Sequence, residues 1–325
     1  MFSRFTRTLA IAAATTLAAL TFTGCTPASS HEITVVVHDS VVISKSLLAD
    51  FKKSTGITVK LLKAGDAGAM TNKLVLTKDA PIGDAVYGID NTFAGVAAAN
   101  KIIDGSLTAV DYGDVCMNYD KTWFSTHEQA APSSIDDLIK PEFNGLTVIE
   151  NPNDSSTGLS FLAATVAKYG DAGWQPYWQA LKNNKVKVDG GWEDAYYTDF
   201  SGSSGKGDYP IVLSYSSSPA DEIRDNGESQ TAALLDGCYR QTEYAGVLAG
   251  SSHATDAAKF VQFLLTDEFQ KSIPGAMYMY PIAPGTSLPE AWAQFAPAAT
   301  APLGGDLDVN GKRTSWLKAW AALFG

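Results

Sequence analysis

The sequence predicts an α/β fold arranged in two lobes with a ligand cleft between them. Strand-like and helix-like segments alternate along the chain, which is typical of an open, largely parallel sheet covered by helices. The region that follows the N-terminal segment has about 300 residues, the usual size of two domains. Two further strand-like runs, near 112–119 and 237–245, are placed to cross between two α/β blocks. A single large doubly wound domain is the alternative.

The first block, residues 32–113, contains three β-rich runs, each followed by a segment with helical spacing. Together with 242–285 it is expected to form lobe 1. The β-rich runs lie at 33–38, 57–62 and 84–89, and the helical segments lie at 44–53, 67–76 and 91–99. A further strand is expected to begin after Val110.

The second block, residues 118–237, repeats the alternation and is expected to form lobe 2. Its predicted helices lie at 135–139, 158–169 and 192–200, with a short one after Pro219, and its strands lie at 146–150, 186–188 and 211–213. The sequence SGSSGKG at 201–207 predicts a flexible surface loop. A strand at 238–248 and a helix at 254–265 follow, and 286–325 is assigned to neither lobe.

The N-terminus has the pattern of an export signal. Arg4 and Arg7 precede an apolar stretch at 9–22 that is too short for a permanent membrane span. A small residue directly before Cys25 resembles a bacterial lipobox, which predicts a signal peptide at 1–24, lipidation of Cys25 and a tether at 25–31. Several acyl chains would anchor the protein outside the cytoplasm on the cell membrane. Ordinary cleavage near Gly24 is the alternative.

The charge of the chain bears on its partners. Removal of 1–24 leaves 22 basic and 35 acidic residues, a net charge of −13. This balance argues against nucleic acid as a partner and is compatible with attraction of a cationic ligand.

Two cysteines remain beyond the lipidation candidate. Cys116 and Cys238 lie in strand-like runs, and an even pair in an exported protein suggests a disulfide. Two buried free thiols are the alternative.

No catalytic motif or metal-ligand spacing stands out. The chain lacks nucleophile-elbow, phosphate-loop and zinc-binding patterns, and its four histidines are scattered. We therefore expect a binding protein without cofactor or metal site. Two other classes stay open: an exported hydrolase that works with a carboxylate pair, and a structural surface lipoprotein.

Candidate binding residues lie at strand ends, because ligands of open α/β sheets bind beyond the carboxyl ends of the strands. Asp90 ends a strand in the sequence GIDN. The sequence NPNDSSTG at 151–158 opens a helix, where hydroxyls and free N–H groups can bind an anion, although simple capping by Ser156 or Thr157 is equally consistent. Trp192, Tyr215 and the aromatics at 277–281 offer faces that suit a flat cation.

Several segments, taken in order, resemble the thiamine-binding proteins of ABC importers. The resemblance covers the chain from about Ile33 to its end. The matching segments are GDAVYGIDNTF at 83–93, VDYGDVCMNYDK at 110–121, NPNDSSTGLSFL at 151–162, GGWEDAY at 190–196, VLSYSSSPA at 212–220 and IPGAMYMYPIAPGTSLP at 273–289.

The resemblance implies a type II periplasmic binding fold that closes on its ligand by a hinge motion and delivers the ligand to permease subunits. We also expect a monomer. Asp90 would face the cation, Trp192 and Tyr215 would stack on its rings, and hydroxyls would receive the hydroxyethyl arm or its phosphate. The implied ligand-binding set is His38, Asp39, Asp90, Asn91, Ser155, Ser156, Thr157, Trp192, Tyr215, Asp221 and Tyr278, with Ser214 as a secondary candidate.

This chain departs from the family pattern at three aromatic positions. His38 precedes Asp39 where an aromatic can occur, Asp221 replaces an aromatic, and Tyr278 stands where Trp is frequent. The pocket is therefore expected to be more acidic, to favour a cation and to disfavour a diphosphate. Another organic cation, a polyamine or ferric iron is the alternative ligand, since Tyr215, Tyr278 and His38 could mimic an iron site.

Overall fold

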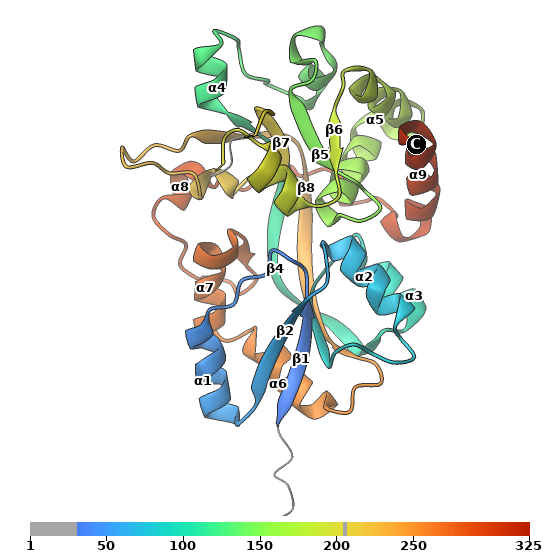
Figure 1. The fold of residues 1–325 in the computed structure, drawn as a ribbon, viewed down its shortest axis with the longest axis vertical. Helices are drawn as coiled ribbons and strands as arrows, with labels where there is room; N and C mark the ends of the chain where they lie inside the picture. Colours follow the sequence, from blue (N-terminus) through green and yellow to red (C-terminus); the bar gives the residue numbers. More distant parts are fainter. Residues whose placement is uncertain (1–30, 204–206) are drawn as a thin grey trace, which may run out of the picture. The chain divides into compact units, whose positions relative to one another are not determined.

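The computed structural model describes residues 31–203 and 207–325 (Figure 1). The predicted signal peptide, Cys25 and the tether up to residue 30 lie outside the described residues, as do positions 204–206 of the predicted loop. Residues 31–325 form one compact unit.

A nine-stranded sheet organises the described residues, in the order β2-β1-β3-β8-β4-β7-β5-β6, with β9 paired to β4. β1 pairs in parallel with β2 and β3, and β5 pairs in parallel with β6 and β7. The strands are β1 (Glu32–Val37), β2 (Thr58–Lys63), β3 (Ala85–Asp90), β4 (Ile103–Asp120), β5 (Thr147–Glu150), β6 (Lys187–Asp189), β7 (Ile211–Tyr215), β8 (Thr231–Leu248) and β9 (Tyr280–Pro281).

Helices cover both faces of the sheet, as predicted for the α/β class. Along β1, Val35 and Val37 pack in the cluster that holds Phe51 and Phe260, whereas Val36 packs on the opposite side with Met70. The α-helices are α1 (Lys45–Thr55), α2 (Ala67–Leu76), α3 (Ala94–Asn100), α4 (Lys121–Thr126), α5 (Ser156–Asn183), α6 (Ala254–Phe263), α7 (Asp267–Met277), α8 (Trp292–Phe295) and α9 (Val309–Phe324). The short helices are η1 (Ile135–Ile139), η2 (Pro141–Phe143), η3 (Asp194–Asp199) and η4 (Ser218–Ala220).

β4 and β8 are 18-residue antiparallel strands that run through both α/β blocks (Figure 1). Both begin earlier than predicted: β4 starts at Ile103 and β8 at Thr231. The early part of β4 is polar and partly exposed, so it lacks the apolar alternation that marks a strand in sequence. Its pairing with β8 nevertheless holds it extended. A disulfide joins Cys116 of β4 to Cys238 of β8, with the sulfur atoms 2.01 Å apart.

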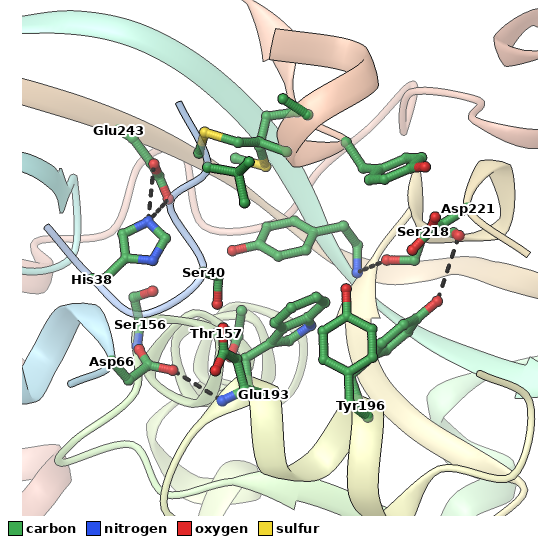
Figure 2. Close-up of a pocket in the computed structure, with 18 residues that line it drawn as sticks. His38, Ser40, Asp66, Ser156, Thr157, Glu193, Tyr196, Ser218, Asp221 and Glu243 are labelled. Carbon is green, nitrogen blue, oxygen red and sulfur yellow. Dashed lines mark hydrogen bonds and ion pairs between the residues drawn. The ribbon is translucent and has the colours of Figure 1, made fainter. Parts of the chain in front are cut away.

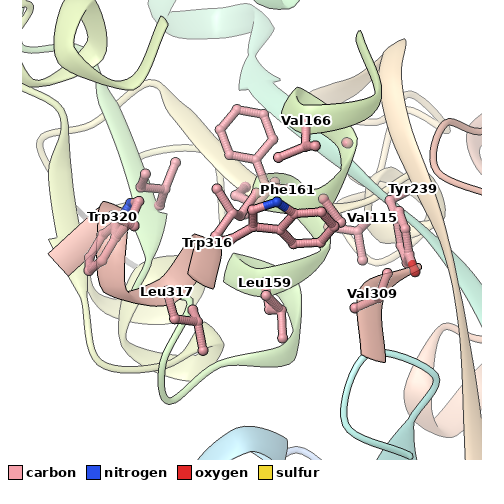
Figure 3. Close-up of a cluster of buried hydrophobic side chains, with 14 of the residues drawn as sticks. Val115, Leu159, Phe161, Val166, Tyr239, Val309, Trp316, Leu317 and Trp320 are labelled. Atoms are coloured by element: carbon pink, nitrogen blue, oxygen red, sulfur yellow. The ribbon is translucent and has the colours of Figure 1, made fainter. Parts of the chain in front are cut away.

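The C-terminal segment, left unassigned by the sequence, packs on α5 (Figure 3). Trp316, Leu317 and Trp320 of α9 are buried, and Trp320 meets Trp178 of α5 edge to face, with ring centroids 5.9 Å apart. α5 also runs 14 residues beyond the predicted end at 169, across a kink at Gly170, whose φ is +69°. α9 therefore belongs with the β5–β7 side of the sheet.

Two of the remaining predicted helices are present in the structure as other helix types. Residues 135–139 form a single 3₁₀ turn, and the helix predicted at 192–200 is a short π-helix, η3. The sequence did not predict α4, α7, α8, α9 or η2. Of the helices in residues 31–203 and 207–325, none has the length and apolar character needed to cross a membrane.

Candidate ligand-binding site

A pocket of about 230 Å³ lies where the two α/β blocks face each other (Figure 2). One side is lined by the ends of β1 and of the segment before α2, and the other by the start of α5, by η3 and by the end of β7. The segment that follows α7 closes the rim. The lining residues are His38, Ser40, Val42, Asp66, Ser156, Thr157, Trp192, Glu193, Tyr196, Tyr197, Tyr215, Ser218, Asp221, Glu243, Ala276, Met277, Tyr278 and Met279.

Aromatic rings form one wall of the pocket. Trp192 stacks on Tyr196, with ring centroids 4.9 Å apart and planes 15° apart, and it approaches Tyr215 at 6.4 Å. The indole Nε1–H donates to Ser214 Oγ at 2.9 Å, which fixes the orientation of the ring. A ring held in this way offers its π-face at little cost in side-chain entropy.

Asp66 connects the two sides of the pocket. It caps the start of α2, where its Oδ1 accepts from Ala67 N at 2.6 Å, and the same oxygen accepts from Ser156 N of α5 at 3.1 Å. Its Oδ2 accepts from Trp192 N at 3.0 Å. Burial raises the pKa of Asp66 although these N–H groups and the nearby His38 act in the opposite direction.

The backbones come close at the same place. Ala69 N donates to Asp154 O at 2.8 Å, which ties α2 to the turn before α5. A Cβ on Gly68 would lie 2.5 Å from Asp154 O, so only glycine permits this approach. The pocket is therefore closed along this edge by direct contact between α2 and the α5 side.

His38 and Glu243 form a buried pair on the β1 side. The His38 Nε2 lies 3.3 Å from Glu243 Oε1 and 3.4 Å from Oε2, and Glu243 is only 2% exposed (Figure 2). Burial acts to lower the pKa of His38, but the charge and hydrogen bond of Glu243 outweigh it, and the pKa is raised. Gln241 Nε2 bridges Glu243 Oε1 and Ser156 Oγ, at 3.3 and 3.4 Å, and so links this pair to α5.

Asp221 and its neighbours add negative charge at the η4 side. Asp221 ends η4 and is partly exposed. Burial and then a hydrogen bond to Asp221 raise the pKa of Tyr278, and burial with the charge of Asp221 raises the pKa of Tyr197 to about 12. Next to it, Glu222 accepts from the buried Tyr196 hydroxyl at 3.1 Å.

Seven of the eleven sequence-predicted residues line this one pocket. They are His38, Ser156, Thr157, Trp192, Tyr215, Asp221 and Tyr278. The structure thus gathers positions that lie far apart in the chain, although the role of each residue stays a prediction.

The other four predicted residues make contacts within the protein instead of lining the pocket. Asp90 is fully buried and accepts from the Thr92 hydroxyl and from Phe93 N, and burial raises its pKa to about 7. Asn91 donates to the Tyr239 hydroxyl and to Arg240 O. Ser155 is the N-cap of α5, and Asp39 accepts from Gly65 N. The Asp90 oxygens thus accept hydrogen bonds within the protein and Asp90 is not among the lining residues, so its contact with the ligand stays a prediction.

Asp66, Glu193 and Glu243 also line the pocket but were not predicted from the sequence. Asp66 precedes a helix and looks like an ordinary N-cap, which it also is. Glu243 lies inside a predicted strand directly after the polar residues Arg240, Gln241 and Thr242, so its charge gave no distinctive signal.

The chemistry of the pocket suits a cation with flat, apolar surface. Its lining combines four carboxylates, from Asp66, Glu193, Asp221 and Glu243, with aromatic rings and two methionines. It contains neither lysine nor arginine. Within 31–203 and 207–325, no group of three or more His, Cys, Asp or Glu side chains is placed to hold a metal ion.

A fold in which two long strands join two α/β blocks around such a pocket is that of a solute-binding protein. A family model described as bacterial extracellular solute-binding protein matches residues 83–299, and the chain belongs to this family. The chain therefore acts outside the cytoplasm.

Comparisons with individual proteins support the same class of protein. A thiamine-binding periplasmic protein of Escherichia coli (strain K12) is 29% identical over 315 residues, which cover 89% of this chain and 92% of that protein. A solved periplasmic thiamin binding protein aligns with a TM-score of 0.77 at 26% identity, covering 90% of this chain and 96% of the other. Iron-bound HitA from Pseudomonas aeruginosa shares the fold, with a TM-score of 0.70 at 18% identity and coverage of 90% and 99%. The predicted two-lobed, type II class is confirmed.

Proposed function

We propose that this chain is the receptor of an ABC importer for thiamine, which it captures outside the cytoplasm and passes to permease subunits without chemical change. The observation that carries the proposal is the pocket itself, where aromatic rings and carboxylates meet and no lysine or arginine is present. The names of the similar protein from Escherichia coli and of the solved thiamin binding protein support thiamine as the ligand.

Thiamine joins an aminopyrimidine ring to a cationic thiazolium ring. Trp192 and Tyr215 would stack on these rings, each cation–π contact contributing about 0.5–2 kcal/mol. Asp66, Asp221 and the His38–Glu243 pair would balance the positive charge, and Ser156 or Thr157 would receive the hydroxyethyl arm. The methionines of the rim would cover apolar ring edges.

Capture would involve closure of two lobes. We place lobe 1 at 32–113 with 242–285 and lobe 2 at 118–237, so that the hinge lies in the central parts of β4 and β8. The segment 286–325 goes with lobe 2, because α9 packs on α5. The protein acts as a monomer, and Cys25 carries the lipid that anchors it to the membrane.

Titration of purified residues 26–325 with thiamine tests the proposal. We expect one-to-one binding that quenches tryptophan fluorescence, confirmed by calorimetry, and a loss of at least tenfold in affinity in Trp192→Ala, since a stacking face is removed. Trp123→Phe is the matched control, because Trp123 stacks on His127 outside the pocket. A flat titration at high micromolar thiamine would reject the ligand while leaving the receptor class in place.

The same protein serves to test the other ligands. Spermidine and ferric iron are titrated in parallel, since Tyr215, Tyr278 and His38 line the same pocket. A visible absorbance band on iron addition would favour an iron receptor, and saturable binding of spermidine without thiamine binding would favour a polyamine receptor.

A further inference from the structure

We propose that the contact between α3 and the start of α9 holds the two lobes together in the closed form, with Asn310 and Arg313 as positioning residues for ligand capture. The inference rests on the proposed function, because it concerns the closure of the same two lobes. Three observations carry it: α9 is anchored in one lobe, its first turn packs on the other, and this contact adjoins the edge at which the pocket is closed.

α9 is anchored on the β5–β7 side of the sheet along most of its length. Trp316 and Trp320 are buried, and Trp320 meets Trp178 of α5 edge to face (Figure 3). Near the end of α9, Lys182 of α5 donates from Nζ to Leu323 O. Because α9 is held to α5 in this way, its first turn must follow lobe 2 in any motion of the lobes.

The first turn of α9 packs on α3, which lies in the block placed in lobe 1. The guanidinium carbon of Arg313 lies 4.4 Å from the centre of the buried Phe93 ring, at the distance of a cation–π contact. The Arg313 Nε has no hydrogen-bond partner among the described residues. A Cβ on Gly95 would lie 1.9 Å from Asn310 Oδ1, so the absence of a side chain at Gly95 lets α9 approach this closely.

This contact adjoins the edge at which α2 meets the α5 side. A Cβ on Gly68 would lie 2.5 Å from Asp154 O and 2.6 Å from Phe93 Cζ, so the Phe93 ring lies directly behind that edge. Phe93 therefore packs against Gly68 as well as against Arg313. Since Asp154 and Arg313 both belong to lobe 2, opening of the pocket along the α2 edge would also separate Arg313 from Phe93.

Substitution of Arg313 tests the contribution of this contact to affinity. Arg313 does not line the pocket, so Arg313→Ala removes no contact with the ligand. We expect thiamine to bind about three- to tenfold more weakly, through faster dissociation, because the closed form loses a cation–π contact. Lys318→Ala, at an exposed position of the same helix, is the matched control and should bind as wild type does. Calorimetry and stopped-flow tryptophan fluorescence measure affinity and rate, and an affinity of Arg313→Ala within twofold of wild type would overturn the inference.

A reversible cross-link tests whether the contact must open to admit the ligand. A Cβ at position 95 would lie 3.0 Å from the Cβ of Asn310, so a small shift gives the roughly 3.8 Å of a disulfide in a Gly95→Cys/Asn310→Cys variant of residues 26–325. We expect the oxidised variant to lose uptake of added thiamine, and to retain thiamine when it is oxidised with the ligand bound. The same variant kept reduced is the control. The native Cys116–Cys238 disulfide is buried, so a mild reductant should leave it intact.

Two outcomes of the cross-linking experiment would overturn the inference. Equal uptake of thiamine by the oxidised and reduced forms would mean that the contact persists in the form that admits the ligand. Failure of the cross-link to form in the thiamine-saturated variant, measured by mass spectrometry, would mean that the contact is absent from the closed form.

Small-angle X-ray scattering separates this inference from the thiamine proposal. Absence of thiamine binding by wild type would remove thiamine as the ligand, but the oxidised and reduced forms of the double variant can still be compared without ligand. A smaller radius of gyration for the oxidised form would support closure at the α3–α9 contact, and equal radii would overturn it.

Discussion

Replacement of Asp66 by Asn gives a direct test of how the pocket is held closed. The carboxylate accepts from Ala67 N within its own helix and from Ser156 N and Trp192 N on the other side of the pocket. Asn retains one carbonyl oxygen and caps a helix as well as Asp does, so α2 should be unaffected. Its Nδ2, however, cannot accept from Trp192 N. The substitution therefore weakens contact across the pocket without removing the cap.

The expected magnitude follows from these bonds. Hydrogen bonds to a charged group each contribute about 1.5–3 kcal/mol, but burial raises the pKa of Asp66, which means that desolvation offsets part of the gain. A net loss of about 1–2 kcal/mol, from the lost Trp192 N contact and the lost charge on the oxygen that accepts from Ser156 N, corresponds to a five- to thirtyfold weaker affinity for thiamine. The melting temperature should change by no more than a few degrees, since neither the cap nor the core is altered.

Calorimetry and amide hydrogen exchange together provide the assay. We expect exchange at Trp192 N to become faster in Asp66→Asn, while exchange at Ala67 N and Ser156 N, which share the retained oxygen, stays nearly the same. Asp50→Asn, on the exposed face of α1, is the charge control. An affinity within twofold of wild type, together with unchanged exchange at Trp192, would refute the role of Asp66 in closure.

One further substitution and the reduction of the disulfide test the interior. Asp90→Asn should raise the free energy of unfolding above pH 7 by a few kcal/mol and leave thiamine affinity within about threefold, because Asp90 does not line the pocket. The folded pKa of Asp90 is raised to about 7 from 3.8, so the stability that the protonated form provides is present below pH 3.8 and is lost as the pH rises towards 7 and beyond. Urea unfolding of wild type and variant at pH 5 and pH 8 measures this difference in the free energy of unfolding. A loss of ligand binding in the variant would restore Asp90 to the site. Reduction of the Cys116–Cys238 disulfide, which spans 122 positions, should lower the free energy of unfolding by about 2–5 kcal/mol, and equal urea midpoints with and without reductant would contradict this.

Local sequence patterns were enough to predict the class of fold. The runs at 33–38, 57–62 and 84–89 are β-rich and the segment 67–76 has helical spacing, and each corresponds to an observed element. The early parts of β4 and β8 were missed because long-range pairing, and not local pattern, keeps them extended. The helix at 309–324 was missed for a similar reason, since its burial against Trp178 depends on a contact between distant positions.

The site was predictable where residues carry recognisable chemistry and not where tertiary pairing gives them a role. Trp192 and Tyr215 follow polar turns or strand ends, and both line the pocket. Asp66 meets partners 90 and 126 positions away, and Glu243 meets His38 across 205 positions. No local pattern contains such information, and the strand-end rule that favoured Asp90 does not say to which side its carboxylate turns.

The buried acids around β8 explain why the pocket presents a carboxylate at its floor. Asp90 and Asp111 are fully buried, and their pKa values are raised first by burial and also by the charge of Glu243. The raised pKa values favour the protonated form of both side chains. The Tyr87 hydroxyl donates a hydrogen bond to Asp111. Glu243 alone among these three acids has a basic partner, His38, within 3.3 Å. Of these three acids, only Glu243 lines the pocket, which places its carboxylate where a cationic ligand would bind.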